Sequence, residues 1–189
     1  MTNSIPVNTN QDIQLSPSTS NPNEEVPRNP EKIYINQNSI LFGNPMKEIL
    51  IKNADKYGNV DINEAIRQGV LNFNHTFLTY LLNSIGVDKL HKSSLGYGYP
   101  RLIIVLDDEY WNVVVFDKSK GLTIGEGVID DIDIKIEISK EEAVRALLSS
   151  DIKAFMKNSV INGNTKIETI AKKLELYSKG YLDLYNELT

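Results

Sequence analysis

The chain contains two histidines, no cysteine and several groups of acidic residues, so the candidates for catalytic chemistry are the histidines, the serines near them and the carboxylates. A Ser-His-Asp arrangement could be drawn from His91 and the neighbouring Ser93 and Ser94. The chain lacks the Gly-x-Ser-x-Gly motif that places a nucleophilic serine on a sharp turn after a strand. His75 falls one position off the apolar stripe of an expected helix, so we expect it at the surface. We therefore predict no catalytic residue and no enzymatic activity.

Two acidic groups and one glycine pair could suggest an ion or phosphate site. Asp107-Asp108-Glu109 and Asp130-Asp131-Asp133 lack the spacing of a calcium-binding EF-hand loop, and the two histidines form no metal motif. Gly125-Glu-Gly127 lacks both the Lys-Ser/Thr ending of a phosphate loop and the glycine spacing of a dinucleotide site. We predict solvated turns and strand ends at these places, with no metal and no cofactor.

The charge of the chain disfavours polyanionic partners. The formal net charge is −5 and the isoelectric point is about 5.1, so nucleic acids and anionic membranes repel the chain as a whole. Tyr97, Tyr99 and Arg101 could stack on bases. Without a basic stripe around them, we predict no nucleic-acid binding and expect this loop to line a cavity mouth instead.

Cysteine usage and hydropathy bear on location. The absence of cysteine excludes disulfides and thiolate zinc sites, and it fits a reducing compartment. No apolar run approaches the roughly 18 residues that span a bilayer. We therefore predict no stable membrane insertion and a cytoplasmic location.

Composition divides the chain into a tail and one domain. Residues 1–32 are rich in Asn, Ser, Thr, Gln and Pro and too poor in apolar residues to offset the entropy of ordering. We predict a disordered tail there and one domain over residues 33–189. Within that domain we expect a mainly helical part at 33–94, a sheet at 95–138, and helices with one short strand at 139–189.

Two helices are expected in the helical part. The first runs from Met46 to Tyr57, where Gly58 ends it. The second opens at the capping-box spacing of Asp61–Glu64 and continues to Gly86. Its apolar residues recur at steps of three and four, as a core-facing helix requires: Ile66, Val70, Phe73, Phe77, Tyr80 and Leu81.

Four segments have strand character, and the last alternates most regularly. The segments are Arg101–Leu106, Tyr110–Phe116, Leu122–Glu126 and Ile132–Ile138. In the fourth, isoleucines at every second position face one way, while Asp133, Lys135 and Glu137 face the other. Such alternation is typical of an antiparallel sheet with one buried face and one wet face.

Helices are expected again after the sheet. Ser139-Lys-Glu-Glu142 is a full capping box that opens a helix through Leu148. A short helix is expected at Ile152–Met156 and a brief extended segment at Val160–Ile161. Thr165-Lys-Ile-Glu168 is a second capping box, and we expect it to open a last helix with these residues facing inward: Ile167, Ile170, Ala171, Leu174 and Tyr177.

From Tyr110 to about Tyr181, this order of elements resembles the sterol carrier protein 2 (SCP2) family of lipid-binding domains. The likeness lies in the ordered set of paired strands, an alternating strand, a capped helix, a short helix, a last strand with its turn, and a final helix. The segments that correspond are Asp131–Ser139, Glu141-Glu142 in the capped helix, Ser149–Met156, Val160–Asn164 and Thr165–Leu176.

The resemblance implies an α+β fold in which helices cover one face of an antiparallel sheet of about five strands. It also implies non-catalytic binding or transfer of an apolar ligand, such as a sterol, a fatty acyl chain or a phospholipid, in a tunnel between sheet and helices. Each buried methylene contributes about 0.8 kcal/mol, so a long chain needs few polar contacts. Candidate tunnel residues are Trp111, Val113, Val115, Phe155, Met156, Ile167, Ile170, Leu174 and Tyr177.

Other interpretations of the same residues remain open. Each candidate tunnel residue could simply be packed in a filled core. The protein could then be a protein–protein or self-association module, for example a homodimer, that keeps the SCP2-like fold without a ligand. The amphipathic segment Tyr181–Leu188 could supply such an interface. A third possibility is an accessory domain of an enzyme, with no active site of its own.

Overall fold

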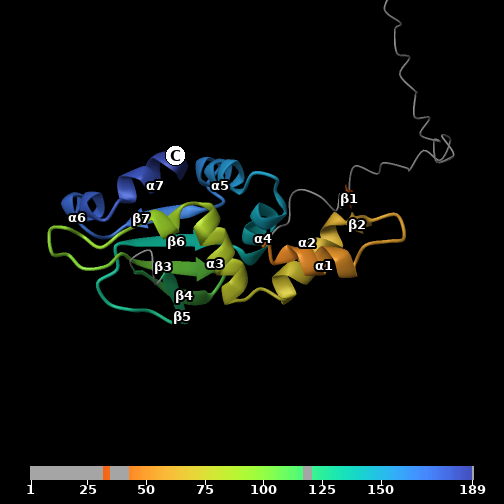
Figure 1. Ribbon diagram of the computed structural model, residues 1–189, viewed down its shortest axis with the longest axis horizontal. Coiled ribbons are helices and arrows are strands. Elements are labelled where there is room, and N and C mark those ends of the chain that lie inside the picture. The colour runs from red at the N-terminus through yellow and green to blue at the C-terminus, as the bar shows by residue number, and fades with distance from the viewer. Residues whose placement is uncertain (1–31, 35–42, 117–120, 189) are drawn as a thin grey trace, which may run out of the picture.

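The computed structural model describes residues 32–34, 43–116 and 121–188. The predicted disordered tail lies outside the described residues except at Lys32. The described part combines helices with a five-stranded sheet, so the predicted α+β class and the number of strands in the main sheet are confirmed (Figure 1).

The main sheet has the strand order β5-β4-β3-β6-β7. Its strands are β3 (Arg101–Leu106), β4 (Glu109–Val115), β5 (Leu122–Glu126), β6 (Ile134–Ile138) and β7 (Lys166–Thr169). Three neighbouring pairs are antiparallel, but β3 and β6 are parallel.

The prediction of a wholly antiparallel sheet is therefore wrong for its central pair. The backbone N–H of Asp133 donates to the carbonyl of Arg101 at 2.7 Å, and the Asp133 carboxylate accepts from the Arg101 N–H at 2.8 Å. These bonds place the start of β6 beside the start of β3, so the two strands run in the same direction.

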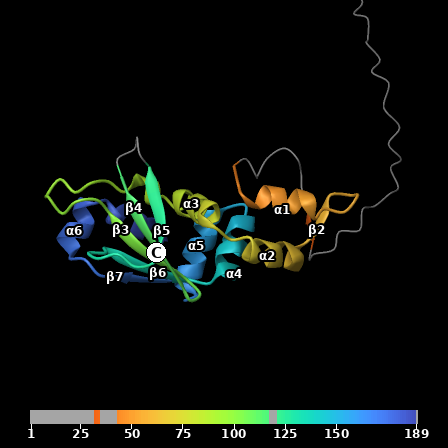
Figure 2. The same cartoon turned by 90° about the horizontal axis from the view of Figure 1, so that it is seen from below.

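One face of the sheet forms the main core. In β6, Ile134, Ile136 and Ile138 are buried, while Lys135 and Glu137 are partly exposed, as the alternation predicted. The helices that supply buried residues to the same core include α3 (His75–Ser84), α4 (Lys140–Leu148), α5 (Ile152–Ile161) and α7 (Tyr181–Leu188) (Figures 1 and 2).

The N-terminal elements lie at the far end of the molecule from α6 (Lys173–Ser178), next to α4 (Figure 1). They are α1 (Met46–Lys52), α2 (Ile62–Leu71), and strand β2 (Asn59–Asp61), which pairs with β1 (Lys32–Tyr34). α2 packs against α4 at Gly69, where an added Cβ would lie 2.6 Å from Val144 Cγ1. Glycine at this position therefore allows the two helices to approach closely.

Both helices expected in this part are shorter than predicted. α1 ends at Lys52, because the Asp55 carboxylate accepts hydrogen bonds from the backbone N–H groups of Tyr57 and Asn59 and turns the chain into β2. The expected helix from Asp61 to Gly86 is broken into α2 and α3. The break occurs because Asn74 Oδ1 accepts from the Thr76 N–H at 2.8 Å and starts a new helix. One turn of 3₁₀ helix, η1 (Val87–Lys89), follows α3.

The elements after α4 also differ from the prediction. Val160 and Ile161 are the last residues of α5, and the last strand is β7. The Thr165 hydroxyl bonds to the Ser159 hydroxyl at 2.7 Å, and Ile167 pairs with Ile136 on β6. The predicted capping box at Thr165 is therefore wrong, and the expected last helix is replaced by β7, α6 and α7.

Candidate ligand-binding surface and its buried anchor

Three of the nine candidate tunnel residues lie in the packed core. The side chains of Val113, Val115 and Met156 are only 0 %, 1 % and 2 % exposed. A side chain that lines a ligand-sized cavity keeps part of its surface accessible to a water molecule. These three residues therefore pack against other protein side chains and contact no such cavity in this conformation.

Three further candidates are partly buried: Trp111, Phe155 and Ile167. Trp111 and Ile167 lie on the same face of the sheet but on different strands, β4 and β7. One row of register partners crosses β4, β3, β6 and β7 and consists of Trp111, Ile104, Ile136 and Ile167, in that order. Three strand spacings separate Trp111 from Ile167, which is about 14 Å. The buried Ile104 and Ile136 occupy the middle of the row. Phe155 on α5 also packs against the edge of the core.

The remaining three candidates are exposed. Ile170 follows β7, while Leu174 and Tyr177 lie on α6, and the exposed fractions of these residues are 49 %, 57 % and 68 %. The expectation that they face inward on a long helix is wrong, because α6 has six residues and turns this side to solvent. We call Ile170, Leu174 and Tyr177 the α6 apolar surface.

A loop at residues 91–100 lies at the same end of the molecule as α6 (Figure 1). Two contacts join them: the Ser93 and Ser178 hydroxyls are 2.6 Å apart, and the His91 N–H donates to the Lys179 carbonyl at 3.2 Å. Tyr97 of this loop is exposed, whereas Tyr99 packs on the ring of Phe116. The loop is thus held against α6 by polar contacts.

A buried ionic cluster lies directly after α6, and we call it the Asp133 anchor. Asp133 Oδ1 accepts from Lys179 Nζ at 2.6 Å, and Asp133 Oδ2 accepts from the Tyr181 hydroxyl at 3.0 Å. Lys179 also donates to Glu175 Oε1 at 2.8 Å. Together with the Arg101 N–H, these donors satisfy the Asp133 carboxylate, which has no exposed surface. The anchor joins the start of β6 to the segment between α6 and α7.

The anchor also determines the protonation of Tyr181. Burial raises the pKa of the Tyr181 phenol well above its usual value, and the negative charge of Asp133 raises this pKa further. The phenol therefore stays neutral and keeps its proton for the hydrogen bond to Asp133.

Sequence patterns predict little of this cluster. The prediction that Asp133 lies on the wet face of the strand is wrong, because Asp133 lies just before β6 and turns inward to Lys179. Lys179 and Tyr181 were not identified as site residues. A lysine between the two apolar stripes around Gly180 is a weak signal, and its partner lies 46 residues earlier in the chain.

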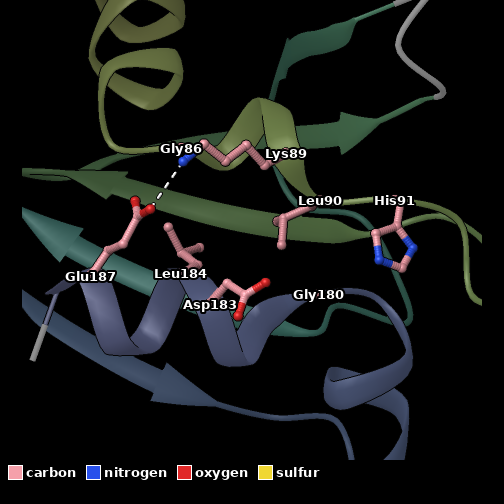
Figure 3. A pocket seen from close by; sticks show the side chains of 8 residues that line it. All are labelled: Gly86, Lys89, Leu90, His91, Gly180, Asp183, Leu184 and Glu187. Carbon is pink, nitrogen blue, oxygen red and sulfur yellow. Dashed lines mark hydrogen bonds and ion pairs between the residues drawn. The ribbon is translucent and has the colours of Figure 1, made fainter.

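A small cavity lies between the turn after α3 and α7 (Figure 3). Its volume is about 40 Å³, and it is lined by Gly86, Lys89, Leu90, His91, Gly180, Asp183, Leu184 and Glu187. Glu187 accepts from Lys89 at 2.9 Å and from Lys153 at 2.8 Å, and these bonds lower the pKa of Glu187. A cavity of this size holds a few water molecules and cannot hold an acyl chain.

The acidic groups considered as metal sites make ordinary contacts. Glu109 Oε1 accepts from Lys140 Nζ at 2.6 Å, and Asp131 pairs with Arg101 at 3.7 Å. Among the residues that the structure describes, no three His, Asp or Glu side chains are grouped so that they could hold a metal ion. None of the helices in the described ranges is both long and apolar enough to cross a bilayer.

Comparisons with known proteins do not place the chain in a family. No family model and no curated protein matches it. A solved structure of a double mutant of the sec-alkyl sulfatase PisA1 aligns with 64 % of this chain and 17 % of that enzyme, at 15 % identity and a TM-score of 0.37. The chain thus matches less than a fifth of the enzyme, and so weak a likeness supports no conclusion about fold or activity.

Proposed function

We propose that this protein is a non-catalytic binding protein for an apolar ligand, such as a sterol, a fatty acyl chain or a phospholipid. The ligand contacts the α6 apolar surface and Ile167 at the neighbouring edge of the sheet. The observation that carries the proposal is the exposure of Ile170, Leu174 and Tyr177, three large apolar side chains on one short segment. The resemblance to the SCP2 family supports the same ligand class.

The fold leaves apolar side-chain area of the α6 apolar surface in contact with water. Burying a Leu or Ile side chain fully contributes about 1.5–3 kcal/mol. Leu174 and Ile170 are each about half exposed, so a bound acyl chain that covers them recovers part of that free energy. Val113, Val115 and Met156 have no such area left and act as the supporting core.

The attachment of α6 allows it to adapt to a ligand. A helix of six residues has little stability of its own. Gly180, with a φ of +87°, separates it from α7, and the Asp133 anchor fixes the chain just before this glycine. We infer that α6 shifts about this fixed point when a ligand enters beside Ile167.

The proposal is tested by titrating the protein with the fluorescent fatty acid cis-parinaric acid. Replacing both Leu174→Ser and Tyr177→Ser removes two exposed apolar side chains and is expected to weaken binding at least about tenfold, since tenfold corresponds to about 1.4 kcal/mol. The matched control is Leu71→Ser, because Leu71 is 67 % exposed on α2 at the other end of the molecule. Absence of binding by the unaltered protein, or equal effects of the two variants, would refute the proposal.

A second candidate is self-association through the α6 apolar surface. It is favoured by the tight packing around Val113, Val115 and Met156, since the core at these residues is complete without a ligand. Sedimentation velocity over a range of protein concentrations distinguishes the two candidates. A dimer that Leu174→Ser with Tyr177→Ser dissociates, in a protein that binds no cis-parinaric acid, supports this second function.

A further inference from the structure

Two lysines lie among the exposed apolar side chains of the α6 segment. Lys172 and Lys173 lie between Ile170 and Leu174, and both are exposed. Within the part of the chain that the structure describes, the side-chain ammonium group of neither lysine makes a hydrogen bond or an ion pair. Other lysines are engaged by carboxylates, namely Lys89, Lys135, Lys140, Lys153 and Lys179. The segment therefore presents two unpaired positive charges beside the α6 apolar surface.

We propose that residues 170–177 dock on the surface of an anionic phospholipid bilayer. Ile170, Leu174 and Tyr177 enter the headgroup region, and the ammonium groups of Lys172 and Lys173 contact lipid phosphates. This docking adds to the proposed function the surface from which a lipid ligand is taken. Only that addition rests on the proposed function.

The geometry of the segment suits a bilayer surface. Leu174 and Tyr177 are three residues apart on α6 and so lie on the same side of the helix. Lysine side chains lay their methylene stems along apolar surface while the charged end stays in the polar layer. Tyrosine is enriched both at protein interfaces and at the level of lipid headgroups, whereas lysine is depleted from the centres of protein interfaces. The two lysines therefore favour a lipid surface over a protein partner.

The acidic side chains near the segment are already occupied. Glu175 accepts from the buried Lys179 at 2.8 Å, and Glu168, two residues before Ile170, pairs with Lys135 at 2.9 Å. The chain as a whole carries a formal charge of −5, which disfavours anionic surfaces at long range. At physiological salt this repulsion is screened beyond about 8 Å, so the two lysines that touch the surface determine the local attraction.

The test is co-sedimentation with vesicles of pure phosphatidylcholine and with vesicles that also contain phosphatidylserine. We expect the protein to bind the anionic vesicles at least about tenfold more strongly, because each surface lysine contributes to the attraction. Lys172→Glu with Lys173→Glu removes this preference. The control, Lys47→Glu with Lys52→Glu, makes the same charge change on exposed lysines of α1 and leaves the preference intact.

The same variants separate docking from ligand binding. In the absence of vesicles, Lys172→Glu with Lys173→Glu should bind the uncharged fluorescent sterol dehydroergosterol like the unaltered protein, because this probe has no carboxylate that the exchanged charges could repel. Equal binding to both vesicle types, or equal losses in the two charge variants, overturns membrane docking and leaves ligand binding to be judged by the fatty-acid titration. Preference for anionic vesicles together with loss in the α6 variant alone supports docking even if cis-parinaric acid does not bind.

Discussion

Lys179 donates a hydrogen bond to Asp133 over 2.6 Å, and both side chains are almost completely buried. The pair connects two parts of the chain that are 46 residues apart. Because a charge is costly to bury alone, each residue requires the other in the folded state. The pair therefore fixes where the C-terminal helices meet the sheet.

Removing the lysine should show this dependence. Lys179→Met leaves the Asp133 carboxylate buried without its cationic partner, and breaking such a pair typically costs about 3–5 kcal/mol of unfolding free energy. Urea denaturation followed by circular dichroism measures the loss. Lys173→Met is the matched control, since Lys173 is exposed, and it should change stability by less than about 0.5 kcal/mol. Similar stabilities of the two variants would show that the anchor is not needed for folding.

Stability should also fall at alkaline pH because of Tyr181. Its folded-state pKa is raised above the unfolded value of about 10, so its contribution is complete below pH 10 and is lost as pH rises further. Between the two pKa values, each pH unit costs up to about 1.4 kcal/mol. Tyr181→Phe should remove this part of the pH dependence, which urea denaturation between pH 8 and pH 11 would measure. An unchanged slope in the variant would contradict the assignment.

Gly69 should be intolerant of any side chain. An added Cβ would lie 2.6 Å from Val144 Cγ1 on α4 and 3.0 Å from Met46 Sδ on α1, so Gly69→Ala forces α2 and these two side chains apart. We expect a loss of about 1–3 kcal/mol in unfolding free energy, as for other overpacked sites. Adding Val144→Ala should restore part of the loss by removing the closest atom. If Gly69→Ala is as stable as the unaltered protein, the two helices do not pack this closely in solution.

Substitutions of buried and of exposed candidate ligand residues should differ in their effect on the free energy of unfolding. Met156→Ala removes a buried side chain and should cost about 2–5 kcal/mol. Leu174→Ala alters a side chain that is 57 % exposed and should cost less than about 0.5 kcal/mol. Thermal unfolding of both variants measures the difference. A large loss for Leu174→Ala would mean that α6 packs more tightly against the sheet than the structure shows.

Local sequence patterns predicted the elements in which the residue spacing along the chain matches the structure that forms. The alternation from Ile132 to Ile138 predicted β6 and its buried face, because side chains alternate along a strand. Ser139 caps α4 as its spacing with Glu142 predicted, through a hydrogen bond from the Glu142 N–H to Ser139 Oγ at 3.1 Å.

Local patterns failed where a distant partner decides the structure. Thr165–Glu168 fits a capping box, yet the pairing of Ile167 with Ile136 makes this segment a strand. The spacing of Ile170, Leu174 and Tyr177 fits a core-facing helix, but β7 replaces the first turn of that helix and the structure leaves the three side chains exposed. The anchor could not be predicted at all, since no local pattern in the sequence relates Asp133 to Lys179.

The central claim is that an apolar ligand binds at the α6 segment and not in the centre of the sheet. Hydrogen–deuterium exchange with and without a saturating fatty acid tests it most directly. We expect slower exchange in residues 170–178 on binding and unchanged exchange in β4. Slower exchange centred on β4, or no change anywhere in a protein that binds the fatty acid, would contradict the proposed location of the ligand.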